Sequence, residues 1–380
     1  MDPHKDTLDA LNRNLSLSEK LRAIHAVLKE RHGFIDRIAV VVYDPKSDLL
    51  KTFIHSSGGD DPLSRYQVKL TEAGSLRAIL QTGQPRVVND LTIFDQGLQE
   101  HTKRIAAQGY RSSYTLPVYF NGLFLGFVFF NSYQKDPFQP GALCDLDLFG
   151  HLVSLVIINE LSTIRMMLST VQAARHITAY RDMETGEHIG RMAHYARLIA
   201  GELAPQYGFD DEYVERLFLF SPLHDIGKIG MPDAILKKAE KLTEGEFEIM
   251  KGHTMKGRQI IDAILQDFGL DTYRQMDMLR NMAEYHHEAI DGSGYPHGVR
   301  REEIPIEARI IAVADIFDAL TSRRHYKEAW TNEEAFSLLQ RLAGFKLDEN
   351  CVQALSKNSR AVAEIQGAWL TVSPDPRGPH

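Results

Sequence analysis

The chain lacks a cysteine framework, since Cys144 and Cys351 are the only two cysteines among its 380 residues. Two thiols so far apart offer neither a disulfide network nor the paired spacing of a structural zinc site. The sequence has no long apolar run either: a stretch such as Phe127–Phe130 falls far short of the about 20 residues of a membrane span. No charged start leads into an apolar segment, so no secretory signal is expected. These absences predict a cytoplasmic protein without a membrane segment.

Positive charge is also in deficit, with 43 Lys and Arg residues against 51 Asp and Glu residues and a net charge of −8. A general nucleic-acid binder usually has a basic surface, so this class is disfavoured. A small phosphate ligand remains compatible, because a bound metal ion can dominate the local field. Apolar residues make up 43% of the chain and charged residues 25%, as in folded globular proteins. At about 100–200 residues per domain, the length predicts two domains.

The first half changes from a helical period to a strand period. Residues 5–31 carry leucines at helical spacing, and short runs rich in β-branched residues then follow between turn residues. Asn121-Gly122 separates two of these runs and favours a type I′ hairpin turn. We expect strands at Arg37–Asp44, Leu49–Ser56, Arg65–Leu70, Arg86–Asp90, Tyr114–Phe120 and Leu123–Phe130, with helical pieces at Thr71–Gln81 and Gln96–Gln108. This mixture predicts an α+β domain with an antiparallel sheet.

A long helix is predicted to join the two halves. From Gly141 to about Ala174, apolar residues such as Leu148, Leu152 and Leu155 recur at three- and four-residue steps. A helix that leaves one domain and enters another is typical of a coiled-coil linker, and an ordinary core helix is the alternative. We therefore expect domains at residues 1–150 and 176–372, a linker helix at 151–175 and a disordered tail at 373–380.

The second half has an almost entirely helical pattern, which predicts an all-α bundle. Thr243 with Glu246, and Thr331 with Glu334, fit capping boxes at helix starts. The expected helices are Met192–Leu203, Glu212–Phe220, Glu244–Ile249, Arg258–Leu265, Leu279–Tyr285, Ile306–Leu320 and Glu333–Ala343.

Histidines and carboxylates are concentrated on different predicted helices of this bundle. His224 and Asp225 are adjacent, and an imidazole beside a carboxylate can bind a divalent ion. Asp315 interrupts an apolar run, where burying an unpaired carboxylate would be costly. Glu184 and His188 are four residues apart and so share one helix face. The candidate ligands are Glu184, His188, His224, Asp225, His253, His286, His287 and Asp315.

The donor types of this set favour hard or borderline metals. Mixed imidazole and carboxylate ligands without thiolate suit iron or manganese, and the eight candidates exceed the needs of one tetrahedral ion. Two ions about 3.5–4 Å apart can generate a hydroxide and clamp both oxygens of an in-line phosphoryl displacement. The sequence therefore predicts a metal-dependent phosphohydrolase with two to three Fe or Mn ions and no organic cofactor.

Two features of the first half, the step Leu116-Pro117-Val118 and a hairpin ending at Gly126-Phe127, accompany its order of strands and helices. Over about residues 10–160, this pattern resembles a GAF domain, a module that senses small ligands and dimerises. The resemblance implies an unknown small ligand and a homodimer joined through the linker helix. A purely dimerising role is the alternative, and no anchor for haem, bilin or an iron–sulfur cluster is found.

Several short motifs follow one another in the second half. They are His224-Asp225-Ile226-Gly227-Lys228, Pro232-Asp233, Lys241-Leu242-Thr243, Met250-Lys251 with His253, His286-His287-Glu288, Asp291-Gly292-Ser293-Gly294-Tyr295-Pro296, Ala314–Ser322 and Tyr326-Lys327. In this order they resemble an HD-GYP domain, the branch of the HD phosphohydrolase superfamily that degrades cyclic di-GMP, over about residues 170–345. His325 and the segment Gly344–Asp348 depart from the family pattern.

The resemblance implies roles for individual residues. Asp225 would bridge two ions and act in catalysis with Lys228, which would contact the scissile phosphate. Glu184 together with His188 is similar to the trinuclear members of the family. The implied metal ligands are Glu184, His188, His224, Asp225, His253, His286, His287 and Asp315. The implied substrate contacts are Lys228, Gly294, Tyr295, Pro296, Arg324 and Lys327.

The implied activity is hydrolysis of cyclic di-GMP to pGpG and on to GMP, gated by the GAF-like half. Two alternatives stay open: a phosphohydrolase of another cyclic nucleotide, and a catalytically silent effector that binds cyclic di-GMP. Neither a nucleic acid nor a membrane is expected as a partner.

Overall fold

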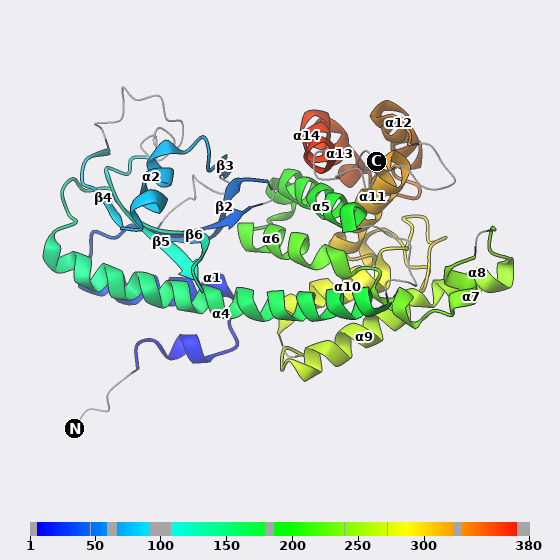
Figure 1. The fold of residues 1–380 in the computed structure, drawn as a ribbon, viewed down its shortest axis with the longest axis horizontal. Coiled ribbons are helices and arrows are strands. Elements are labelled where there is room, and N and C mark those ends of the chain that lie inside the picture. The colour runs from blue at the N-terminus through cyan, green and yellow to red at the C-terminus, as the bar shows by residue number, and fades with distance from the viewer. Residues whose placement is uncertain are drawn as a thin grey trace, which may run out of the picture. The chain divides into compact units, whose positions relative to one another are not determined.

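The computed structural model describes residues 6–45, 47–58, 67–91, 108–178, 186–238, 240–271, 273–322 and 329–370 (Figure 1). The chain divides into two compact units. The first comprises residues 1–164 with 210–212, and the second comprises residues 165–209 with 213–380. Helix α4 (Pro140–Thr178) begins in the first unit and ends in the second. The predicted tail at 373–380 lies outside the described residues, as does the predicted helix Gln96–Gln108 except for its last residue.

The first unit contains a six-stranded antiparallel sheet in the order β3-β2-β1-β6-β5-β4. The predicted antiparallel α+β architecture is confirmed. The turn between β5 and β6 has φ values of 49° at Asn121 and 79° at Gly122, as the predicted type I′ hairpin requires. The strands are β1 (Arg37–Asp44), β2 (Leu49–Ser57), β3 (Gln67–Lys69), β4 (Arg86–Val88), β5 (Ser112–Phe120) and β6 (Leu123–Ser132).

Alternate side chains of β6 face two helical layers. Phe127 and Phe129 belong to a buried cluster that includes residues of α2 (Gly74–Thr82). Phe130 faces α4, where a Cβ built on Gly150 would lie 3.4 Å from the Phe130 ring. The alternation of a strand thus distributes apolar rings to both sides of the sheet.

The prediction of one helix over residues 5–31 is wrong for the first part of this range. Asp9–Asn12 forms a short 3₁₀ helix, and α1 (Leu17–Arg31) begins only after Ser16. The Ser16 hydroxyl accepts a hydrogen bond from the Glu19 N–H, while the Glu19 carboxylate accepts one from the Ser16 N–H. This capping box satisfies two backbone donors and fixes the start of the helix, a signal that the periodicity of leucines did not reveal.

The described residues of the second unit form helices and turns with one isolated bridge between Ala343 and Leu347. The predicted helical bundle is confirmed, and both predicted capping boxes are present at Thr243 and Thr331. Helices α7, α13 and α14 were not among the predicted ones. The α-helices are α5 (Gly186–Tyr207), α6 (Asp211–Phe220), α7 (Asp233–Leu236), α8 (Glu244–Lys251), α9 (His253–Asp267), α10 (Asp277–Tyr285), α11 (Ile306–Thr321), α12 (Asn332–Leu342), α13 (Glu349–Lys357) and α14 (Ser359–Leu370).

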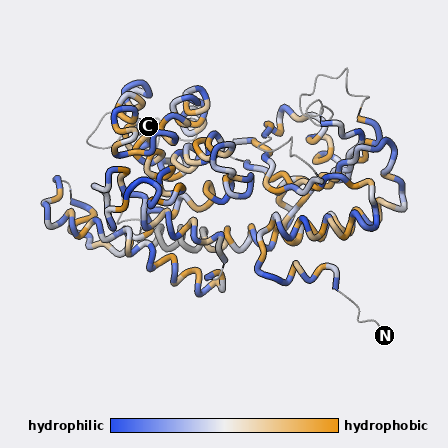
Figure 2. The backbone as a smooth tube through the Cα atoms, turned by 180° about the vertical axis from the view of Figure 1, so that it is seen from behind, coloured by the Kyte–Doolittle hydropathy of each residue, from blue (hydrophilic) through white to orange (hydrophobic). Residues whose placement is uncertain are grey.

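Helix α4 carries apolar residues along much of its length (Figure 2). The part Pro140–Ile164 is long and apolar enough to cross a membrane. Core helices of soluble proteins also meet this criterion of length and composition. Leu148 and Leu155 are 65% and 64% exposed. The expected absence of a membrane segment therefore stays a prediction.

Candidate metal centre

The turn after α6 brings His224 and Asp225 against the first turn of α9. Two short 3₁₀ helices flank the pair, at Ser221–Leu223 and Ile226–Gly230. A Cβ built on Gly227 would lie 1.8 Å from the His253 carbonyl oxygen, so only glycine permits this approach. Asp225 Oδ1 consequently lies 3.1 Å from His253 Nε2.

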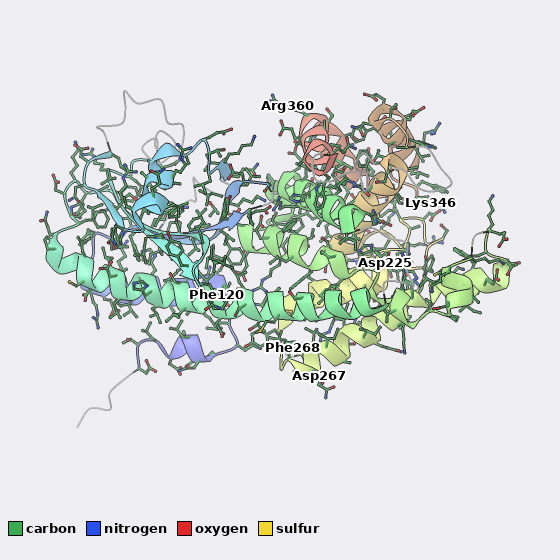
Figure 3. All side chains as sticks on the ribbon, viewed as in Figure 1. Phe120, Asp225, Asp267, Phe268, Lys346 and Arg360 are labelled. Carbon is green, nitrogen blue, oxygen red and sulfur yellow. The ribbon has the colours of Figure 1, made fainter. Side chains whose placement is uncertain are left out.

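Five of the predicted ligands gather around this contact, and we call them the histidine cluster: His224, Asp225, His253, His286 and His287. One candidate ligand atom from each of the last four lies within 4.8 Å of the others. His224 Nε2 joins them at 3.2 Å from Asp225 Oδ2. Asp225 lies inside the second unit and is only 5% exposed (Figure 3).

Backbone carbonyls fix how the imidazoles are oriented. A carbonyl can only accept a hydrogen bond, so a ring nitrogen Nδ1 that lies next to one carries the proton. The Nε2 atom of the same ring then presents a lone pair. The lone pairs of His253 and His286 then face Asp225 Oδ1, which is buried and accepts no hydrogen bond within the described residues. The Nδ1 contacts are His224 to Ser221, His253 to Met250 and His286 to Met282, each 2.8 Å.

This convergence of acceptors tests whether a metal ion fits. Asp225 Oδ1 lies 3.4 Å from His286 Nε2, and the two Nε2 atoms of His253 and His286 also lie 3.4 Å apart. Acceptors this close repel one another in a buried site unless a cation lies among them. The donor set is nitrogen and carboxylate oxygen without thiolate, which suits iron or manganese.

The protonation states agree with this arrangement. Burial would raise the pKa of Asp225, but its neighbours, Lys228 above all, hold this pKa well below its usual range. Burial lowers the pKa of His286, and burial together with His286 lowers that of His287 well below its usual range. The carboxylate is therefore charged and these imidazoles neutral near pH 7, as metal ligation requires.

Lys228 is the cation next to the cluster. Its Nζ lies 2.7 Å from Asp225 Oδ2, and its side chain is 19% exposed. An ammonium group in this place can offset negative charge on a phosphate that binds beside the carboxylate.

A second set of polar side chains joins α5 to α11, and we call it the His188 group: His188, Arg191, Asp315, Asp318 and Ser322. His188 Nε2 lies 3.5 Å from Asp315 Oδ1, and His188 Nδ1 donates to Asp318 Oδ2 at 2.6 Å. Arg191 donates to both Asp318 oxygens at 2.8 and 3.0 Å. A carboxylate behind the imidazole fixes its tautomer and its ring orientation, as is common behind metal-bound histidines.

Sequence reasoning assigned no role to Asp318 or Arg191. A signal was available, because His188 and Arg191 are three residues apart on one helix, as are Asp315 and Asp318 on another. Two such matched faces can pair with each other. Burial would raise the pKa of Asp318, but His188 and Arg191 lower it overall.

The Gly-rich loop after α10 covers the cluster with an aromatic ring. Tyr295 stacks on His287 with ring centroids 4.8 Å apart. A Cβ built on Gly294 would lie 2.3 Å from the Ala289 backbone nitrogen, so glycine is needed for the loop to fold back here. Burial raises the pKa of the Tyr295 phenol, and the charges of Asp225 and Asp315 raise it further, while Lys228 acts in the opposite direction.

Glu288 anchors the same loop. Its Oε1 accepts hydrogen bonds from the backbone N–H groups of His297 and Gly298 at 2.6 and 3.1 Å. His297 Nε2 bonds Glu284 at 2.9 Å, so His297 supports the loop. At Gly344–Asp348, where the sequence departs from the family pattern, Lys346 pairs with Asp291 at 2.9 Å and so also holds the loop.

The structure thus brings together seven of the eight candidate ligands in two sets and places Lys228, Gly294, Tyr295 and Pro296 in the same unit. Glu184, Arg324, Lys327 and His325 lie outside the described residues. Their predicted roles stay predictions.

Comparison with known families agrees with the two resemblances. Residues 17–157 match the GAF domain family, and residues 181–351 match the HD domain family. The chain therefore contains a GAF domain followed by an HD domain. Among solved structures, it is similar to the GAF domain of an Acinetobacter phosphoenolpyruvate-protein phosphotransferase, with 15% identity, a TM-score of 0.32, and coverage of 41% of this chain and 90% of that one.

Curated proteins also match part of the chain, among them three phosphodiesterases. The cyclic di-GMP phosphodiesterase response regulator RpfG of Xanthomonas campestris is 42% identical over 52% of this chain and 49% of its own. A cyclic di-GMP phosphodiesterase of Thermotoga maritima is 38% identical over 52% and 51%. The 3′3′-cGAMP-specific phosphodiesterase 2 of Vibrio cholerae is 38% identical over 46% and 31%. The chain spans about half the length of the first two relatives.

Proposed function

The chain combines a GAF domain with an HD domain, and from this premise we propose that it hydrolyses cyclic di-GMP to pGpG and then to GMP. The observation that carries the proposal is the convergence of imidazole lone pairs on the buried carboxylate of Asp225. Two of the relatives described above are named for this substrate.

Two to three divalent ions, Fe or Mn, would be held by the histidine cluster and by His188 with Asp315, and Glu184 would complete the set. When bound, such ions lower the pKa of water and stabilise charge on a phosphodiester. The geometry supports two groups of ligands, since the cluster and the His188 group each place nitrogen beside carboxylate oxygen.

The chain's own residues account for positioning. Lys228 Nζ, beside Asp225, would donate to a non-bridging phosphate oxygen and stabilise the charge that develops there. The Tyr295 phenol stays protonated, because its pKa is raised, and can donate a hydrogen bond to the substrate. Arg324 and Lys327 would bind phosphate or guanine.

A second candidate substrate is a mixed cyclic dinucleotide, favoured by the similarity to the cGAMP-specific enzyme of Vibrio cholerae. A silent effector that binds cyclic di-GMP is the alternative outside catalysis. In a panel of cyclic di-GMP, 3′3′-cGAMP and cyclic di-AMP, we expect the highest kcat/KM for cyclic di-GMP. Faster turnover of cGAMP would reverse the substrate assignment, and tight binding without product would establish the effector.

The decisive experiment is an anaerobic purification followed by two measurements on one sample. Mass spectrometry gives Fe and Mn per chain, and chromatography follows cyclic di-GMP, pGpG and GMP. Two to three ions per chain with pGpG and GMP as products would support the proposal. Full metal loading without any cleavage, also after a screen of small ligands for the GAF domain, would contradict it.

We also propose that the chain is a cytoplasmic homodimer joined through α4, and that a small ligand of the GAF domain gates hydrolysis. The exposure of Leu148 and Leu155, seven residues apart, supports this, because a heptad repeat places both on one seam. Leu155→Glu should shift the mass in light scattering from dimer to monomer. Leu123→Glu, which replaces an exposed leucine on β6 of the same unit, is the control. A dimeric Leu155→Glu variant would exclude this seam.

A further inference from the structure

A row of aromatic rings leads from the histidine cluster to the surface of α8. Tyr295, which stacks on His287, also meets the ring of Phe247 at 6.2 Å with an interplanar angle of 83°. Phe247 is nevertheless 45% exposed. A phenylalanine ring left open beside a buried polar site is a surface on which a flat ligand can stack.

A lysine accompanies this ring. Lys251 lies one turn after Phe247 on α8, with its Nζ 5.2 Å from the Phe247 centroid and 5.8 Å from the Tyr295 centroid. The ammonium group also pairs with Glu248 Oε1 at 2.6 Å, and the lysine side chain is 29% exposed. Because Glu248 takes one donor, the ammonium group has further N–H donors for a ligand above the rings.

The chemistry of this pair matches a purine base. Bases stack on aromatic side chains, and guanine offers O6 and N7 as acceptors to a lysine. The rings continue without a break from Phe247 through Tyr295 to His287. A nucleotide whose phosphate lies at the histidine cluster would therefore carry its base toward α8.

We propose that Phe247 and Lys251 form a base-binding subsite, in which one guanine of the substrate stacks on Phe247 and accepts a hydrogen bond from Lys251. The inference rests on the proposed function, because it takes the phosphodiester to be bound at the histidine cluster. It assigns base recognition to α8, a helix that contributes no metal ligand.

The kinetic test compares two substrates of the metal-loaded full chain: cyclic di-GMP, and ethyl 4-nitrophenyl phosphate, a small diester without a nucleobase. Phe247→Ala should raise KM for cyclic di-GMP about tenfold, with kcat changed little, because base stacking contributes to binding. The small diester should be cleaved as before, and Phe247→Tyr should restore the KM. Lys251→Gln should raise the same KM by a smaller factor. An equal loss on both substrates, or an unchanged KM for cyclic di-GMP, would overturn the proposal.

The matched control is Phe268→Ala. Phe268 is 36% exposed and lies at the far end of α9 from His253, about 22 Å along the helix axis (Figure 3). This variant should leave both substrates unaffected. Circular dichroism of each variant shows whether the fold is kept.

A binding measurement separates this inference from the proposed function. Calorimetric titration compares GMP with ribose 5-phosphate, which lacks the base, on wild-type protein and on Phe247→Ala. We expect wild-type protein to bind GMP more tightly than ribose 5-phosphate. In the variant, the ratio of the two affinities should fall about tenfold. This result would support the subsite even if cyclic di-GMP were not cleaved. Equal affinities of wild-type protein for the two compounds would refute it.

Discussion

The histidine cluster and the His188 group orient their imidazoles by different means. In the cluster, backbone carbonyls three or four residues earlier accept the Nδ1 protons. In the His188 group, the carboxylate of Asp318 accepts that proton, and Arg191 and Ser322 hold the carboxylate in turn. The first arrangement needs only local helix geometry, whereas the second needs side chains from two helices. Replacing a neighbouring side chain should therefore change the orientation of the imidazole more in the His188 group than in the cluster.

The largest effect is expected where the cluster loses its shared ligand. Asp225→Ala removes the carboxylate that faces His253, His286 and Lys228. We expect metal content per chain to fall and hydrolysis of cyclic di-GMP to become undetectable, as measured by mass spectrometry and chromatography. Normal metal content with continued turnover would remove the cluster as the catalytic centre.

A backbone substitution tests whether close approach builds the cluster. Gly227→Ala places a Cβ 1.8 Å from the His253 carbonyl oxygen, so α9 must shift. We expect the free energy of unfolding to fall by about 1–3 kcal/mol, as for overpacked sites, together with metal affinity. Gly201→Ala in α5 is the control, because a Cβ there meets nothing within 4 Å. It should stabilise the helix by up to about 1 kcal/mol. Equal unfolding midpoints in urea for the two variants would contradict the close approach.

Asp318→Asn tests the dependence of His188 on its neighbours. The asparagine amide can keep only part of the hydrogen bonding with Arg191. It no longer presents a charged acceptor to His188 Nδ1. Loss of such a partner typically costs about 10- to 100-fold in metal affinity or activity. We expect the metal content to fall by about one ion per chain while the cluster keeps its ions. Unchanged loading would show that the His188 group holds no metal.

The smallest effect is expected at Asp262, a carboxylate on the surface that pairs with two arginines. Asp262 accepts hydrogen bonds from Arg258 and Arg280, and its side chain is 44% exposed. Burial would raise its pKa, but the two arginines lower it overall. Its contribution is therefore present above the unfolded pKa of about 3.9 and is lost as the pH falls through the lower folded value.

Asp262→Asn should accordingly cost about 0–1 kcal/mol near pH 7, as exposed ion pairs do. The difference from wild type in the free energy of unfolding, measured in urea from pH 7 down to pH 3, should shrink at the acid end. A difference that stays constant over this range would show that the arginines do not act through the charge of Asp262.

Much of the fold could be predicted from local pattern. Alternation and the Asn121-Gly122 turn located the hairpin, because a type I′ turn needs two residues that tolerate positive φ. Side-chain signals likewise located the helix starts at Thr243 and Thr331. The helix before Ser16 was mispredicted, because its leucines kept a helical spacing while the cap at Ser16 began a new helix.

The sequence by itself determined which chemistry the chain can carry. Histidines and carboxylates without paired cysteines specify nitrogen and oxygen ligands, and this choice is a property of the side chains alone. The sequence also identified Asp225 and His253, which lie on separate elements, as members of one site.

Only the tertiary structure decided how those ligands are held. The approach of Gly227 to α9 sets the distance between Asp225 and His253, and the pairing of α5 with α11 places Asp318 behind His188. Such contacts join residues far apart in the chain, so no local period encodes them. They form when the helices pack, and at His188 this packing gives a buried imidazole nitrogen its carboxylate partner.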